Sequence, residues 1–217
     1  MTASTQTELL PETRKRDAEA TKADILRVAT EEFATRGYNG ARVDQIAEET
    51  ATTKRMIYYY FGSKQGLYLS VLEGVYTEFR ILESDLDLDS MNPVDALRAL
   101  AEFTYHHHAS HPNFVRLIQI ENVNRAEHLK TSMRKAELAG SSMSMLEKVM
   151  KQGIENKLFR DDLEAFDVHM MISAYSIFQI ANRHTFNILW NKDLSEKKYI
   201  DKYAKLAGEL VVKTLLK

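Results

Sequence analysis

The sequence predicts an all-α protein, with an N-terminal three-helix helix-turn-helix domain followed by a C-terminal helical bundle. Only 3 prolines and 8 glycines interrupt the 217 residues, and the stretches between them are rich in Ala, Leu, Glu and Lys, which favour helices. Apolar side chains such as Ile25, Val28 and Phe33 recur at the spacing of one helix face. Two short helical patterns, 43–50 and 53–60, are separated by a tight turn, which is typical of a helix-turn-helix.

Capping residues and helix-breaking residues predict where the N-terminal helices begin and end. Residues 1–17 are polar and end in a basic triplet, so we expect a flexible basic arm. An amphipathic helix over 18–36 should end at Gly37, because glycine suits a left-handed position after a helix. Thr53 is a suitable N-cap for the second short helix, and Ser63 for the longer helix that follows.

The remainder of the chain predicts further helices joined by short loops. The acidic stretch 84–92 is a loop, and Asn92 followed by Pro93 indicates an N-cap and a first helical residue. Helices are then expected at 93–110, 112–125, 128–156, 163–190 and 195–216. The expected domains are the arm at 1–17, the helix-turn-helix domain at 18–65 and the helical domain at 66–217.

Composition excludes several classes of protein. The chain has no cysteine, so disulfides and thiolate metal sites are excluded. No apolar run of about eighteen residues occurs, so we expect a cytoplasmic protein that does not enter a membrane. The net charge of -2 does not by itself indicate a nucleic-acid binder. Residues 50–72, however, contain Lys54, Arg55 and Lys64 with no acid, and a local basic face is enough to hold phosphates.

The second short helix carries the side chains expected to read DNA. In a helix-turn-helix this helix enters the major groove with its N-terminus toward the bases. Thr53 would cap it and take a phosphate oxygen, Lys54 or Arg55 would address guanine, and Met56 would touch a thymine methyl. Three consecutive tyrosines, residues 58–60, cannot all be core on a helix, so at least one must face solvent or DNA.

The block from Gly37 to Tyr68 closely resembles the DNA-binding region of the TetR family of repressors. The matching residues are Gly37-Tyr38, Ile46-Ala47, Ile57 to Phe61, Lys64 and Leu67. The resemblance implies a non-enzymatic, cofactor-free repressor that binds double-stranded operator DNA as a homodimer and is released by a small-molecule ligand. It also implies DNA contacts from Arg42, Thr53, Lys54, Arg55, Met56, Tyr58, Tyr59 and Lys64.

Two positions depart from that family's pattern. Arg42 stands where Ser or Thr is usual, and it would still reach a phosphate. Ala51-Thr52 stands where Gly-Val is usual in the turn. A left-handed turn residue with a Cβ costs about 1 kcal/mol, so Ala51 should be strained.

In the helical domain the resemblance is one of architecture. It implies that the helices at 163–190 and 195–216 form a four-helix bundle with a second copy, with candidate interface residues Tyr175, Phe178, Thr185 and Leu189. A pocket among the preceding helices would take an amphipathic or aromatic effector. Methionines gather there, and they are either adaptable pocket walls or ordinary core. The candidate ligand-binding residues are Phe103, His107, Phe114, Gln119, Asn122, Met133, Met170, Tyr175 and His184.

Two alternatives stay open beside the repressor. A helix-turn-helix protein can activate transcription instead. His106, His108, His111 and His169 suggest a metal-dependent bundle enzyme, but the Glu-x-x-His pairs of such enzymes do not occur, so no metal is expected. Surface histidines near a helix end, where they favour the helix dipole, are the simpler interpretation of the run at 106–108.

Overall fold

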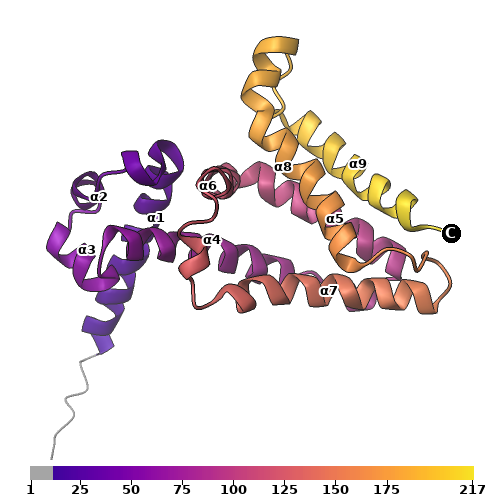
Figure 1. Ribbon diagram of the computed structural model, residues 1–217, viewed down its shortest axis with the longest axis horizontal. Helices are drawn as coiled ribbons and strands as arrows, with labels where there is room; N and C mark the ends of the chain where they lie inside the picture. Colours follow the sequence, from indigo (N-terminus) through magenta and orange to yellow (C-terminus); the bar gives the residue numbers. More distant parts are fainter. Residues whose placement is uncertain (1–11) are drawn as a thin grey trace, which may run out of the picture. The chain divides into compact units, whose positions relative to one another are not determined.

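The structure is a computed structural model that describes the backbone of residues 12–217 and the side chains of 18–217 except 137 and 139–142. The chain divides into two compact units, Met1–Val71 and Leu72–Lys217, and the division falls within one helix (Figure 1). The secondary structure of the described residues is helical, apart from an isolated bridge between Phe159 and Leu216. Among these residues, no helix combines the length and the hydropathy that spanning a bilayer requires.

The first unit contains α1 Glu12–Gly40, α2 Val43–Glu49, α3 Lys54–Phe61 and the start of α4 Lys64–Ser84. Gly37 interrupts α1 with φ 67° and ψ 173°, so the positive φ expected there is confirmed, although its ψ is extended. Residues 12–17 are helical, which shortens the expected arm; its residues 1–11 lie outside the described part of the chain. Ser63 caps α4 as predicted, since its Oγ accepts a hydrogen bond from the Gly66 N–H at 3.0 Å.

The core of this unit consists of the apolar faces that the periodicity predicts. Ile25 and Phe33 of α1 are fully buried, and so are Ile46 of α2 and Ile57 of α3. Tyr68 of α4 completes the core, with its ring in edge contact with Phe33 at a centroid distance of 4.8 Å. Burial of large side chains stabilises such a unit by about 1.5–3 kcal/mol each, and it holds the short helices in place.

The second unit contains α5 Pro93–Ser110, α6 Pro112–Val123, α7 Lys135–Glu155, α8 Ala165–Trp190 and α9 Lys197–Leu215, with short 3-10 turns η1 Leu88–Ser90 and η2 Leu129–Thr131. Helix α5 is central and packs against α7, α8 and α9. Asn92 caps it as predicted, because its side chain accepts hydrogen bonds from the N–H groups of Val94 and Asp95.

The helix predicted at 128–156 begins later than expected, at Lys135. Arg125 and Ala126 have φ values of 57° and 54°, which end helical geometry after α6. The buried Glu121 carboxylate then accepts hydrogen bonds from the N–H groups of His128 at 2.7 Å and Leu129 at 3.0 Å. A buried carboxylate that accepts two backbone hydrogen bonds fixes this turn. The helical pattern of the sequence does not reveal such an interaction.

Helices α7 and α9 end at the same point of the second unit. The Phe159 side chain is fully buried and lies against Gly153, where a Cβ would approach its ring to 2.0 Å. The Arg160 N–H donates to the Leu215 carbonyl at 2.8 Å, and the Lys217 N–H donates to the Leu158 carbonyl at 3.2 Å. These contacts fix the C-terminal end of α9 beside the loop that leads into α8.

Candidate nucleic-acid interface and effector cavity

Helix α3 buries one face and exposes the other. Its buried residues are Ile57 and Phe61, as predicted. Thr53 is its N-cap, and the Thr53 Oγ1 accepts a hydrogen bond from the Met56 N–H at 3.2 Å. The exposed first turn carries Lys54, Arg55 and Met56 without an acidic residue. Free N–H groups and cations at an exposed helix N-terminus are suited to phosphate and base acceptors.

A buried carboxylate in α1 orients α2. Glu32 is almost fully buried, and its side chain accepts hydrogen bonds from the Arg42 backbone N–H at 3.0 Å and from the Arg36 Nε at 3.0 Å. Arg42 is the residue before α2, so the contact anchors the first turn of α2 to α1. The Arg42 side chain remains exposed. The role of Glu32 was not predicted, because nothing local in the sequence distinguishes it from Glu31.

The two lysines expected at the interface differ in their surroundings. The Lys54 Nζ lies 3.1 Å from an Asp44 carboxylate oxygen in an exposed ion pair, a kind that contributes little in water and is easily exchanged for another anion. The Lys64 Nζ lies 5.0 Å from the centre of the Tyr38 ring. Desolvation there lowers the pKa of Lys64, while Glu32 acts in the opposite direction.

The tyrosine triplet separates as its helical positions require. Tyr59 is 77% exposed and Tyr58 is exposed as well, whereas Tyr60 is half-buried. The prediction that the three could not all be core is therefore confirmed. Two phenols on the open face of α3 are available to donate to phosphates beside the basic pair.

The turn between α2 and α3 contains the strained residue that the sequence indicates. Ala51 has φ 48°, in the left-handed region where a Cβ is unfavourable. We expect Ala51→Gly to raise the free energy of unfolding by about 0.5–1 kcal/mol, seen as a higher melting temperature with operator binding retained. Ala20→Gly in α1 is the matched control, and it should lower stability. An unchanged or lower melting temperature for Ala51→Gly would contradict the strain.

The second unit contains two neighbouring, partly open cavities, of about 190 Å³ and about 560 Å³. Tyr76 and Arg80 of α4 and His169 of α8 line both of them. The smaller cavity is otherwise lined by Phe79, Glu83, Leu100, Thr104, His108, Phe114, Ile118, Leu146, Ile172, Ser173 and Ile177. The larger one is otherwise lined by Ala126, Leu129, Lys130, Lys135, Leu138, Met143 and Phe166. Mostly apolar walls with a few polar groups are typical of small-molecule sites.

Two of the three consecutive histidines in α5 belong to the interior. His106 is exposed, but His107 and His108 are 5% and 3% exposed, so the expectation of surface histidines is wrong for these two. Burial, together with the nearby His111 and Arg80, lowers the pKa of His107 to about 4. Burial also lowers the pKa of His108 to about 3. Both rings are neutral at pH 7, and the His108 Nδ1 lies 2.9 Å from the Ser176 Oγ.

This burial predicts a loss of stability in mild acid. Unfolded His108 takes up a proton near pH 6.5, whereas the folded residue, with a pKa of about 3, does not. The contribution of neutral His108 to the free energy of unfolding is therefore present above pH 6.5 and is lost as the pH falls. Between pH 6.5 and pH 5 the loss from His108 alone is about 2 kcal/mol. Urea unfolding should show this fall, and His108→Gln should flatten it. His106→Gln is the exposed control; equal slopes for both variants would contradict the assignment.

The residues expected to bind a ligand are dispersed in the structure. Phe114 lines the smaller cavity, and Phe103 and His107 lie behind its wall against Phe79. Tyr175 lines a separate groove between α8 and α9. The side chains that face solvent are Gln119, Asn122, Met133, Met170 and His184. The sequence prediction of the ligand site did not include Arg80, Glu83 and His169. A signal for the first two was present, because Arg80 and Glu83 are a cation and an acid three residues apart in the apolar part of a helix.

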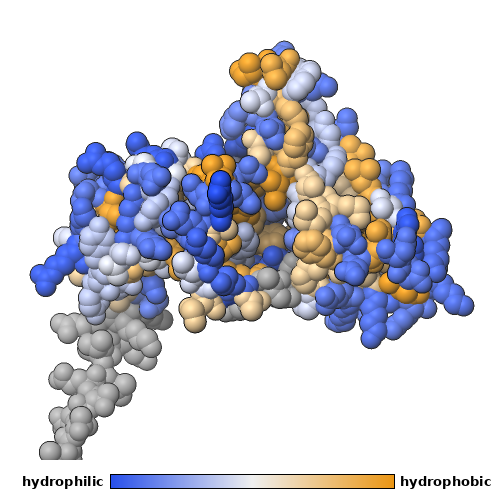
Figure 2. Space-filling view, in the orientation of Figure 1, coloured by the Kyte–Doolittle hydropathy of each residue, from blue (hydrophilic) through white to orange (hydrophobic). Residues whose placement is uncertain are grey.

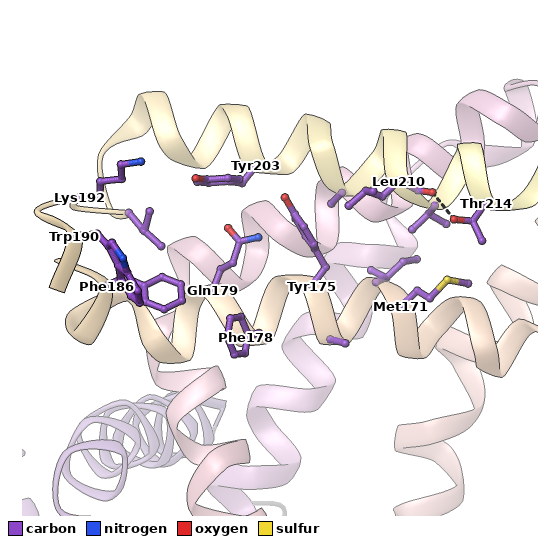
Figure 3. Close-up of a pocket in the computed structure, with 15 residues that line it drawn as sticks. Met171, Tyr175, Phe178, Gln179, Phe186, Trp190, Lys192, Tyr203, Leu210 and Thr214 are labelled. Atoms are coloured by element: carbon purple, nitrogen blue, oxygen red, sulfur yellow. Dashed lines mark hydrogen bonds between the residues drawn. The ribbon is translucent and has the colours of Figure 1, made fainter. Parts of the chain in front are cut away.

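An open apolar groove of about 910 Å³ lies along α8 and α9 (Figure 3). Tyr175 and Gln179 extend from α8 toward α9, and Tyr203 lies on the α9 side. Of the candidate interface residues, Phe178 is 58% exposed, Thr185 and Leu189 are exposed, and Tyr175 is half-buried. Apolar surface also covers the C-terminal end of α8, where Ile188 and Trp190 are exposed (Figure 2). Exposed apolar area of this extent marks an interaction surface.

Metal binding finds no support in the part of the chain that the structure describes. No group of three or more His, Cys, Asp or Glu side chains there could hold a metal ion. His107 and His111 stack ring on ring, with centroids 4.3 Å apart. The buried rings pack instead with Phe79 and Phe114.

A short capped helix that follows α2 after a tight turn, with an open basic and aromatic face, defines a helix-turn-helix DNA-binding regulator. Comparison with known proteins gives the family. Residues 25–71 match the bacterial regulatory proteins of the tetR family, and residues 93–211 match the tetracyclin repressor-like C-terminal domain. The chain therefore belongs to the TetR family of transcriptional regulators. Regulators of this family bind operator DNA and small-molecule effectors and act as dimers.

Named relatives agree with this assignment. The chain is 36% identical to the HTH-type transcriptional repressor NicS of Pseudomonas putida over 85% of this chain and 87% of that protein. It is 41% identical to the HTH-type transcriptional repressor SCO4008 of Streptomyces coelicolor over 48% of this chain and 50% of that one. Among solved structures, the transcriptional regulator SCO4942 of Streptomyces coelicolor has a TM-score of 0.68 and 26% identity, covering 90% of this chain and 98% of that one.

Proposed function

We propose that this chain is a cytoplasmic, homodimeric repressor that leaves its operator when a small molecule enters the cavities of the second unit. The first unit, Met1–Val71, is the DNA-binding domain, and the second, Leu72–Lys217, senses the effector and dimerises. Repression is supported by the names of the relatives NicS and SCO4008. The single observation that carries the proposal is the capped, exposed N-terminus of α3 with its basic and aromatic side chains.

We assign the DNA contacts by the chemistry of the exposed side chains. Lys54 and Arg55 would address guanine acceptors, and Met56 a thymine methyl. Arg42, Thr53, Tyr58, Tyr59 and Lys64 would hold the phosphates and set the position of α3. In a dimer, two copies of α3 would read half-sites one helical turn apart, about 34 Å.

Helix α4 offers a route by which the effector would act. This one helix begins beside the tyrosine-rich end of α3 and carries Tyr76 and Arg80 into both cavity walls. An effector that binds better when α4 is shifted would favour a dimer whose α3 helices no longer match the groove spacing. The affinity for operator would then fall by the difference in effector binding between the two states.

The proposal is tested by binding and by expression. A shift assay with a palindromic site near the protein's own gene should give a complex of one dimer per site. A promoter fusion should be silenced by the chain and restored by the effector. Stronger expression in the presence of the chain would identify an activator instead. Native mass spectrometry of the purified protein would detect a retained small molecule.

A further inference from the structure

Arg80, one of the three side chains shared by the two cavities, is a cation with unused donors. Arg80 donates from Nε to the Leu138 carbonyl at 3.3 Å and from Nη1 to Glu83 at 2.8 Å, and its guanidinium lies over the Phe79 ring. A guanidinium has five N–H donors, so N–H groups remain for a ligand. Its side chain is 15% exposed, and it lines both cavities. Arg80 therefore brings to the walls of both cavities N–H groups beyond those that bind Leu138 and Glu83.

The charges that face the two cavities do not cancel. Arg80, Lys130 and Lys135 line them, whereas Glu83 is the one carboxylate among their described lining residues. Glu83 is buried and already paired with Arg80, so it is not available to a second cation. Burial lowers the pKa of His108 and of His169, so these rings contribute hydrogen bonds and no charge at pH 7. The lining therefore has an excess of positive charge.

The larger cavity also has apolar walls. Leu129, Leu138, Met143 and Phe166 line the larger cavity beside its two lysines. An acid group near the cations would leave the apolar part of the same molecule against these side chains. Both lysines are exposed, and the Lys135 Nζ donates to the Lys130 carbonyl at 2.6 Å. A neutral molecule would form no ion pair with these cations, and an amine would be repelled by them.

We propose that the effector is an amphipathic organic acid whose carboxylate binds Arg80, Lys130 and Lys135 and whose apolar part fills the larger cavity. This inference rests on the proposed function, because it names the chemical class of the molecule that releases the operator. The volumes of about 560 Å³ and 190 Å³ suit a compact molecule rather than a long polymer.

Calorimetry on the full chain tests the sign of the charge. Decanoate, 1-decanol and decylamine share an apolar body, and 1-naphthoate with 1-naphthalenemethanol provides an aromatic pair. At least one carboxylate should bind about tenfold or more tightly than its alcohol, as expected for a charge-assisted contact, and decylamine should bind least. An alcohol that binds as tightly as its acid, tighter binding of decylamine, or no binding by either carboxylate would overturn the inference.

Variants locate the site. Lys130→Gln with Lys135→Gln should remove most of the preference for a carboxylate over its alcohol. Arg80→Lys should weaken this preference while retaining a cation beside Glu83. The control, Lys151→Gln with Lys205→Gln, removes two exposed lysines outside both cavities. A preference that survives both cavity variants would place the acid elsewhere and refute the assignment.

Operator binding without any probe is measured in parallel. If the chain binds operator and an alcohol or an amine releases it, the repressor proposal stands and the organic-acid inference fails. If the chain does not bind operator, the repressor proposal fails, and calorimetry still decides the charge preference of the cavity.

Discussion

Replacing Lys54 and Tyr59 together by alanine should lower operator affinity by about 100-fold or more while leaving the fold intact. Both side chains are exposed on α3, so their loss removes no core contact. Each DNA contact of this kind contributes about 1–3 kcal/mol, and the dimer would lose each one twice. Fluorescence anisotropy with a labelled operator measures the affinity, and the melting temperature checks the fold.

The control for this pair is Lys151→Ala, which removes an exposed lysine from α7 in the second unit. It should bind operator as the unchanged chain does. Salt dependence adds a second readout, because removing a lysine that contacts a phosphate reduces the slope of log affinity against log salt. If the double variant binds operator as tightly as the unchanged chain, α3 is not the helix that reads the DNA. This conclusion would hold whether or not the cavities bind an effector.

Phe178→Glu should convert the dimer to monomers and thereby weaken operator binding. Phe178 is 58% exposed beside the groove along α8 and α9, so it is accessible to a second copy. A carboxylate in an apolar two-fold interface is buried twice, at a cost of several kcal/mol for each unpaired charge. A monomer also loses the gain from binding two half-sites at once. Sedimentation velocity measures the mass at micromolar concentration.

Met133→Glu is the matched control for the same change in chemistry. Met133 is 98% exposed and lies outside the α8 and α9 groove. Adding a carboxylate there should leave both the mass and the operator affinity unchanged. If Phe178→Glu still sediments as a dimer with normal operator binding, the copies associate through another surface.

Local signals in the sequence predict the fold class and the helix that we propose reads DNA. Thr53, Ser63 and Asn92 cap helices as predicted, because a cap depends on groups two or three residues away. The strain at Ala51 and the exposure of Tyr59 follow from the turn and from the helical period. The predicted start of α7 was wrong, because the turn before it is fixed by the buried Glu121 carboxylate, seven and eight residues upstream of the N–H groups that it binds.

Local patterns were enough to predict that this chain is helical and that a capped basic helix near its N-terminus faces outward. The surroundings of His107 and His108, and the cations that face the cavities, depend on how the helices pack. Helical periodicity assigns a face to each residue but does not say which other helix covers that face. Arg80 and Leu138 are 58 positions apart, and His108 and Ser176 are 68 apart. Contacts over such separations depend on how whole helices pack.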